Sequence, residues 1–91
     1  MQKSIHSSRY AVFLAVLREA REQAGLTQIQ LARRIGETQT FISKCERGER
    51  RIDVIELCTF CEAFGLDLKQ FVTKLERAMS GRKHAGAKRH A

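Results

Sequence analysis

The segment from Thr27 to Gly48 constrains the fold more than any other part of the chain, because it places helix start and stop signals close together. Its sequence is TQIQLARRIGETQTFISKCERG. Thr27 begins a Thr-x-x-Gln capping box, in which the first and fourth side chains each accept a hydrogen bond from the other's backbone amide. Gly36 can end a helix in the left-handed conformation, and Thr38 is the next N-cap candidate. The segment therefore predicts two short helices joined by a tight turn.

The residues before this segment predict one longer helix. Ser8 is a plausible N-cap, and apolar residues at helical spacing predict a helix over Arg9–Ala24 that ends at Gly25. Val12 and Val16 lie off the predicted inward face. That face consists of Tyr10, Phe13, Leu14, Leu17, Ala20, Arg21 and Ala24.

Two more helices are predicted after a charged loop. A second capping box, Asp53 with Glu56, begins a helix that ends at Gly65, and Asp67 caps the next helix. The first of these has the inner face Val54, Leu57, Phe60, Cys61 and Phe64. The second repeats apolar residues at Leu68, Phe71, Val72, Leu75 and Met79.

The fold class predicted from these signals is all-α. The chain of 91 residues contains no proline, and no segment alternates apolar and polar residues long enough to be a strand. We expect a compact five-helix bundle whose second and third helices form a helix-turn-helix. Residues 1–7 are expected to be frayed, residues 8–79 to form the domain, and residues 80–91 to form a basic, disordered tail.

The three cysteines have two interpretations. Cys58 and Cys61 form a CxxC pair, but both fall inside a predicted helix, and Cys45 alone cannot complete a four-ligand zinc site. We therefore interpret the thiols as buried core or interface groups in a reduced, cytoplasmic protein. Ile55 and Cys58 widen the apolar surface of their helix, either as extra core or as a dimer contact, which we favour.

Charge points to a polyanionic partner, although its distribution matters more than its sum. The net charge is +7, but residues 80–91 contribute four Lys or Arg and no acid, leaving +3 for residues 1–79. Residues 33–51 contain six basic and three acidic side chains, and the basic ones flank the predicted third helix. DNA or RNA fits this distribution better than an anionic membrane. No apolar stretch is long enough to span a bilayer.

Several constrained positions agree in order and spacing with a known family. They are Arg21, Ala24-Gly25-Leu26-Thr27-Gln28, Leu31-Ala32, Gly36, Thr38, Ile42-Ser43-Lys44 and Glu46-Arg47-Gly48. From about Leu17 to Phe71 the chain resembles the phage-repressor-type helix-turn-helix, the lambda-repressor-like or Xre family. It departs from the family pattern at the three cysteines, where the family more often has a different apolar residue, and these changes affect packing.

The resemblance implies roles for individual residues. Gln28 would donate to a DNA phosphate, and Gln39 and Thr40 would contact bases, with Ser43 and Lys44 one turn later on the same face. Backbone phosphates would be contacted by Thr38, Arg47, Arg50 and Arg51. The resemblance also implies an ion pair between Arg21 and Glu46 that joins the first helix to the third.

The resulting functional hypothesis is a sequence-specific DNA-binding transcriptional regulator, a repressor by preference, acting as a homodimer on a palindromic operator. An antitoxin, a restriction-modification controller, or an interaction module that has lost base readout are the alternatives. We expect no catalytic residues, no metal and no cofactor. The three histidines, His6, His84 and His90, lie in the predicted tails.

Overall fold

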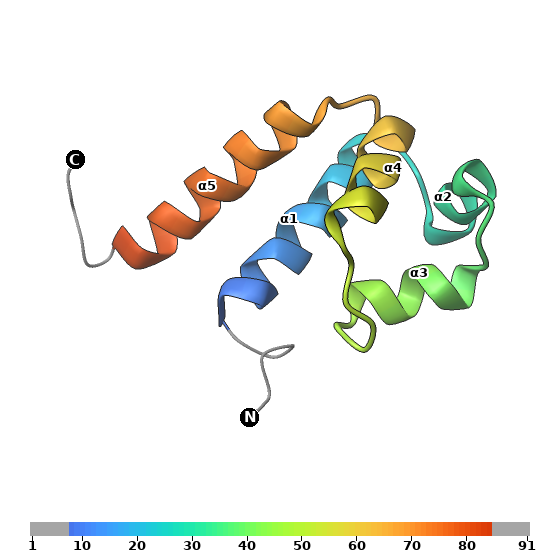
Figure 1. The fold of residues 1–91 in the computed structure, drawn as a ribbon, viewed down its shortest axis with the longest axis horizontal. Helices are drawn as coiled ribbons and strands as arrows, with labels where there is room; N and C mark the ends of the chain where they lie inside the picture. Colours follow the sequence, from blue (N-terminus) through green and yellow to red (C-terminus); the bar gives the residue numbers. More distant parts are fainter. Residues whose placement is uncertain (1–7, 85–91) are drawn as a thin grey trace.

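A computed structural model describes residues 8–84 of the chain, and within them it contains five helices and no strand. This confirms the all-α prediction. The helices α2 and α3 lie together on one side of the molecule, whereas α5 runs back along α1 on the other side (Figure 1). The elements in chain order are α1 (Ser8–Gln23), α2 (Gln28–Ile35), α3 (Gln39–Glu46), α4 (Val54–Phe64) and α5 (Leu68–His84).

The predicted capping residues are present at the starts of α2, α3, α4 and α5, whereas Ser8, predicted to cap the first helix, is itself the first residue of α1. Both predicted boxes are complete, with Thr27 before α2 and Asp53 before α4, and the Thr38 hydroxyl accepts from the amide of Phe41. A third box begins α5, where Asp67 pairs with Gln70 at 2.8 and 2.9 Å. Sequence reasoning identified Asp67 as the cap but missed the glutamine that completes the box.

Left-handed glycines follow α1, α2 and α4 as predicted, and Gly25 after α1 has φ +77°. Gly36 after α2 has φ +74° and Gly65 after α4 has φ +77°, a region that residues with a Cβ rarely adopt. The end of α3 differs slightly from the prediction, because the helix stops at Glu46 and Arg47 is its C-cap. Gly48 then takes the left-handed conformation in the following loop.

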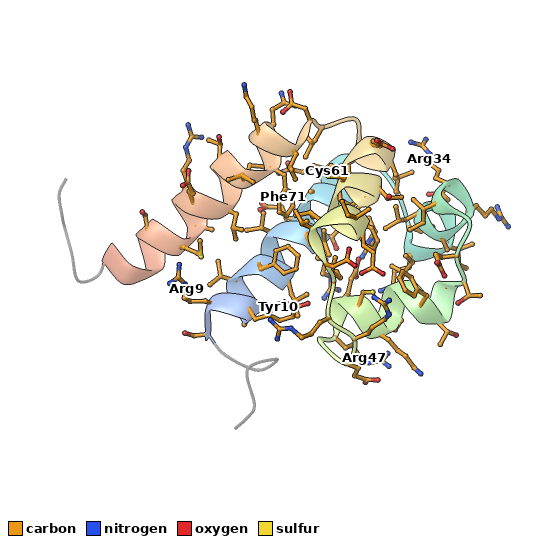
Figure 2. The ribbon with its side chains drawn as sticks, in the orientation of Figure 1. Arg9, Tyr10, Arg34, Arg47, Cys61 and Phe71 are labelled. Carbon is orange, nitrogen blue, oxygen red and sulfur yellow. The ribbon has the colours of Figure 1, made fainter. Side chains whose placement is uncertain are left out.

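The inner surface of α1 is wider than the predicted stripe. Val12 and Val16 were predicted to lie off that stripe, but both are buried in the core beside Leu17. The reason is that α1 packs against α3 on one side and α5 on another, so two faces of one helix are covered. On the α5 side, the rings of Phe13 and Phe71 meet edge to face with centroids 6.0 Å apart. Figure 2 shows Phe71 and Cys61 well inside the molecule.

The first turn of α4 contradicts a second prediction. Val54 was assigned to the inner face, but it is 60% exposed, and the neighbouring Ile55 is 70% exposed. The helix enters the core only from its second turn, where Leu57, Phe60, Cys61 and Phe64 are buried. Ile55 is therefore not additional core, whereas Cys58 is partly covered.

The last helix continues beyond the predicted end of the domain. We predicted a solvated tail from Ser80, yet α5 runs without interruption to His84. No proline is present to stop it, and a single glycine such as Gly81 costs a helix only about 1 kcal/mol. The other predictions for the termini concern residues 1–7 and 85–91, which lie outside the described residues.

The three free thiols differ in accessibility. Cys45 and Cys61 are completely buried, and Cys58 lies at intermediate depth. Burial raises the pKa of Cys61 to about 11, and it also raises the pKa of Cys45. Both buried thiols therefore remain protonated and unreactive near neutral pH.

This difference predicts the pattern of thiol modification. In the native protein, a maleimide or a disulfide reagent should modify Cys58 first, and all three thiols should react after unfolding in guanidinium. The Cys58→Ser variant should be nearly inert while folded, as measured by mass spectrometry over time. Fast native labelling of Cys61 would contradict the packing described here.

Candidate nucleic-acid interface

Two contacting helices, α2 and α3, form the candidate interface. On the inner side of α3, Ile42 and Cys45 are fully buried. On its outer side Gln39, Thr40 and Lys44 are exposed, and Ser43 is partly covered. An eight-residue helix with one apolar and one polar face can pack on the domain and still present side chains outward. The structure thus brings the four predicted base-reading residues onto one surface.

A buried ion pair attaches α3 to α1. Arg21 Nε donates to Glu46 Oε2 at 2.6 Å, and Arg21 Nη2 donates to Glu46 Oε1 at 3.0 Å. The two side chains are only 8% and 5% exposed. The remaining guanidinium nitrogen, Nη1, donates to the carbonyl oxygen of Leu26 at 2.8 Å. The ion pair implied by the family resemblance is therefore present, and it also anchors the connection into α2.

The same carboxylate orients the two glutamines that begin α2 and α3. Gln28 Nε2 donates to Glu46 Oε1 at 2.9 Å, and Gln39 Nε2 donates to Gln28 Oε1 at 2.8 Å. An ionised carboxylate can only accept, so the Gln28 amide must turn its nitrogen toward Glu46 and its oxygen toward Gln39. Each glutamine keeps one further amide hydrogen for another acceptor. Sequence reasoning missed this chain of contacts.

Arg47 lies at the surface beside the end of α3 (Figure 2). Its Nε donates to Glu49 Oε2 at 2.8 Å and its Nη1 donates to the Ser43 hydroxyl. The hydrogen bond between Arg47 and Glu49 raises the pKa of the arginine and lowers the pKa of the carboxyl. Both side chains are about half exposed, so this pair is screened by water and can exchange partners.

Arg50 and Arg51 each lie against an aromatic ring. Arg50 is 4.8 Å from the centre of the Phe41 ring, and Arg51 is 4.4 Å from the centre of the Tyr10 ring. The Tyr10 hydroxyl in turn accepts from the backbone amide of Ile52. These contacts hold the loop after α3 against α1 and α3. Sequence reasoning assigned both arginines to phosphates and missed their aromatic partners, because Phe41 and Tyr10 lie on other elements and the loop itself contains no aromatic residue.

Arg50 also forms a two-pronged ion pair with Glu56. Its Nη1 and Nη2 donate to the two carboxylate oxygens at 3.1 and 2.8 Å. Hydrogen bonds from Arg50, and then from the Asp53 backbone amide, lower the pKa of Glu56. The predicted site residues thus differ in how firmly contacts within the protein hold them.

The described chain contains neither a cluster that could hold a metal ion nor a helix that could cross a membrane. Among residues 8–84 no three His, Cys, Asp or Glu side chains gather in a way that could hold a metal ion. In the same part of the chain, no helix has both the length and the apolar character needed to cross a membrane.

Comparison with known proteins identifies the family. Residues 17–71 match a family model described as helix-turn-helix. The chain belongs to the Xre, or lambda-repressor-like, helix-turn-helix family. Domains of this family bind DNA, and the chain is accordingly a DNA-binding regulator. A search of curated proteins found no match.

Solved structures agree with this assignment. An Xre-family-like protein from Pseudomonas syringae pv. tomato is 49% identical, with a TM-score of 0.73 over 81% of this chain and 90% of that chain. A variant of the restriction-modification controller protein C.Esp1396I is 25% identical, with a TM-score of 0.74 over 80% and 92%. The clp gene regulator ClgR from Corynebacterium glutamicum, at 22% identity and a TM-score of 0.74 over 87% and 84%, shares the fold.

The buried ion pair predicts a large effect of Arg21→Ala on stability. Removing one partner leaves the Glu46 carboxylate buried without its countercharge, which costs about 3–5 kcal/mol of unfolding free energy. Arg18 on the same helix provides the matched control, because its pair with Glu22 is 64% and 57% exposed. Arg18→Ala should cost at most about 1 kcal/mol in urea denaturation. Equal losses in the two variants would contradict the role assigned to Arg21.

Proposed function

We propose that the protein is a transcriptional repressor that binds a palindromic operator as a homodimer and reads the major groove with α3. The observation that carries this proposal is the hydrogen-bonded orientation of Gln39 at the start of α3. A reading side chain held in one orientation before DNA arrives loses less conformational freedom on binding. We place its action in the cytoplasm, where bacterial DNA lies, and repression would result from blocking polymerase.

The base contacts are proposed for the outer face of α3. The Gln39 carboxamide keeps one N–H and its oxygen, which together match N7 and N6 of adenine. The methyl group of Thr40 suits the methyl group of thymine, and Lys44 can reach O6 and N7 of guanine. Ser43, one turn after Gln39, can hydrogen bond to several base edges.

The phosphate contacts are proposed for the rim of this surface. Gln28 has a second amide hydrogen beyond the one used by Glu46, and it sits in the first turn of α2, where helix amides favour an anion. The Thr38 hydroxyl accepts from Phe41, so its own hydrogen can be donated to a phosphate oxygen. Arg47 and Arg51 supply charge from the loop that follows α3.

A homodimer would give this small domain enough contact with DNA. One recognition helix of about two turns covers few base pairs, so tight specific binding favours two copies on half-sites about one helical turn apart. Val54 and Ile55 form an exposed apolar pair at the start of α4, directly after the loop that carries the arginines. We propose that this pair, with the partly covered Cys58, contributes to the contact between copies.

The alternative functions differ mainly in what surrounds the same domain. A restriction-modification controller remains a specific candidate because of the 25% identity with C.Esp1396I over most of both chains. A controller role would use the base and phosphate contacts proposed above. An interaction module would instead favour apolar or acidic residues on the outer face of α3, where this chain has Gln39, Thr40, Ser43 and Lys44.

Selection of bound DNA from random duplexes tests the proposed readout. The native protein should enrich a symmetric motif, and Gln39→Ala should lose about 1–3 kcal/mol of discrimination at one base position per half-site. Arg47→Ala should weaken binding to all sequences alike and reduce the slope of log affinity against log salt by about one per bound chain. A uniform loss in both variants, or the absence of any enriched motif, would refute the assignment.

The dimer contact is tested by polar replacement of Ile55. Ile55→Gln should shift the protein toward monomer in sedimentation experiments, because it removes exposed apolar area from the proposed contact. Ile29→Gln is the matched control, since Ile29 is also an exposed isoleucine, at 52%, but lies on α2. Identical behaviour of both variants and the native protein would place the dimer contact elsewhere.

A further inference from the structure

Arg50 has more partners within the protein than a surface arginine that only binds phosphate would need. Its guanidinium donates to both oxygens of Glu56 and to the carbonyl oxygen of Arg51, and it covers the ring of Phe41. Phe41 belongs to the first turns of α3, Glu56 belongs to the first turn of α4, and Arg50 lies in the loop between them. One side chain therefore connects the recognition helix, its following loop and the next helix.

The ring under Arg50 also contacts the core. Phe41 meets Phe60 of the core with ring centroids 6.5 Å apart, and Phe60 meets Phe64 at 6.3 Å. The backbone of the loop also folds back onto α3, because the amides of Glu49 and Arg50 both donate to the carbonyl oxygen of Lys44. Arg50 thus closes over a ring that is immediately adjacent to the base-facing Thr40.

The acid that holds Arg50 stands where the other capping boxes of the described chain have an amide. The boxes before α2 and α5 use Gln30 and Gln70 at the fourth position, and only the box before α4 uses a carboxylate, Glu56. Capping alone is satisfied by either residue type. The carboxylate adds one ability that the amide lacks, which is to accept both prongs of an arginine.

We infer that Arg50 is a positioning residue for the recognition helix and that Glu56 is its partner. The pair sets the orientation of α3 relative to α4, and through Phe41 it sets the orientation of Gln39 and Thr40 toward the bases. This inference rests on the proposed function, and it replaces the phosphate contact that the sequence suggested for Arg50. The phosphate contacts of the loop are then left to its neighbours.

Replacing Arg50 with lysine distinguishes a phosphate contact from a positioning role. A phosphate contact needs a positive charge, which lysine retains, whereas the contact with Glu56 and Phe41 needs a planar fork. If Arg50 positions α3, Arg50→Lys and Arg50→Ala should weaken operator binding by a similar factor, on the order of fivefold. The salt slope of the Arg50→Ala variant should equal that of the native protein, because no phosphate contact is lost.

Replacing Glu56 with glutamine should change operator affinity in opposite directions for the two possible roles of Arg50. If Arg50 positions α3, Glu56→Gln keeps the capping box but weakens operator binding by about threefold. If Arg50 binds phosphate, the same change frees the arginine, removes a negative charge and tightens binding. Glu49→Gln is the matched control, because Glu49 pairs with the exposed Arg47 of the same loop. It should leave binding equal to native or slightly tighter in both cases.

A measurement without DNA separates failure of this inference from failure of the proposed function. In ¹⁵N-labelled free protein, Glu56→Gln should shift the amide resonances of Phe41 and neighbouring α3 residues and speed their hydrogen exchange, and Glu49→Gln should not. If the native protein selects no DNA motif but these amides respond, the proposed function fails and the link from Arg50 to α3 stands. If the amides do not respond, or Glu56→Gln tightens operator binding, the inference is wrong.

Discussion

The buried pair between Arg21 and Glu46 is the interaction on which the rest of the interface depends. Both charged side chains are shielded from water, so each depends on the other to compensate its charge. The free-energy cost of separating them holds α3 at a fixed position on α1. The third guanidinium contact, to Leu26, adds the start of α2 to the same assembly. Such a pair is weak evidence of net stability, and its effect here is to define one arrangement of three segments.

The orientation of Gln28 and Gln39, two of the side chains proposed to contact DNA, follows from that pair through hydrogen-bond chemistry. Because the carboxylate of Glu46 only accepts, it decides which end of the Gln28 amide faces inward, and Gln28 then decides which end of Gln39 faces it. A second support acts on the first turn of α3, where Arg50 joins Phe41 to Glu56 of α4. A helix of eight residues is marginal alone, so these tertiary contacts are needed to hold α3 in one position on the domain.

The parts of the fold that were predicted correctly are those decided by neighbours along the chain. The caps at Thr27, Thr38 and Asp53 act on amides within the first turn of their helices, so local sequence is sufficient to recognise them. The predictions that failed required knowledge of what packs where. Val12 and Val16 are buried because a second helix packs over them. Val54 is exposed because no element of the described chain packs over it.

For the interface, the sequence alone determined the two short helices, the outward polar face of the second, and the resemblance that named Arg21 and Glu46 as partners. These properties depend on the spacing of residues along the chain, which can be read from the sequence alone. Only the tertiary structure decided that Gln28 and Gln39 are linked to that pair, and that Arg50 faces an acid and a ring. Those contacts join residues from different helices and loops, and their geometry is set by packing distances that no local pattern encodes.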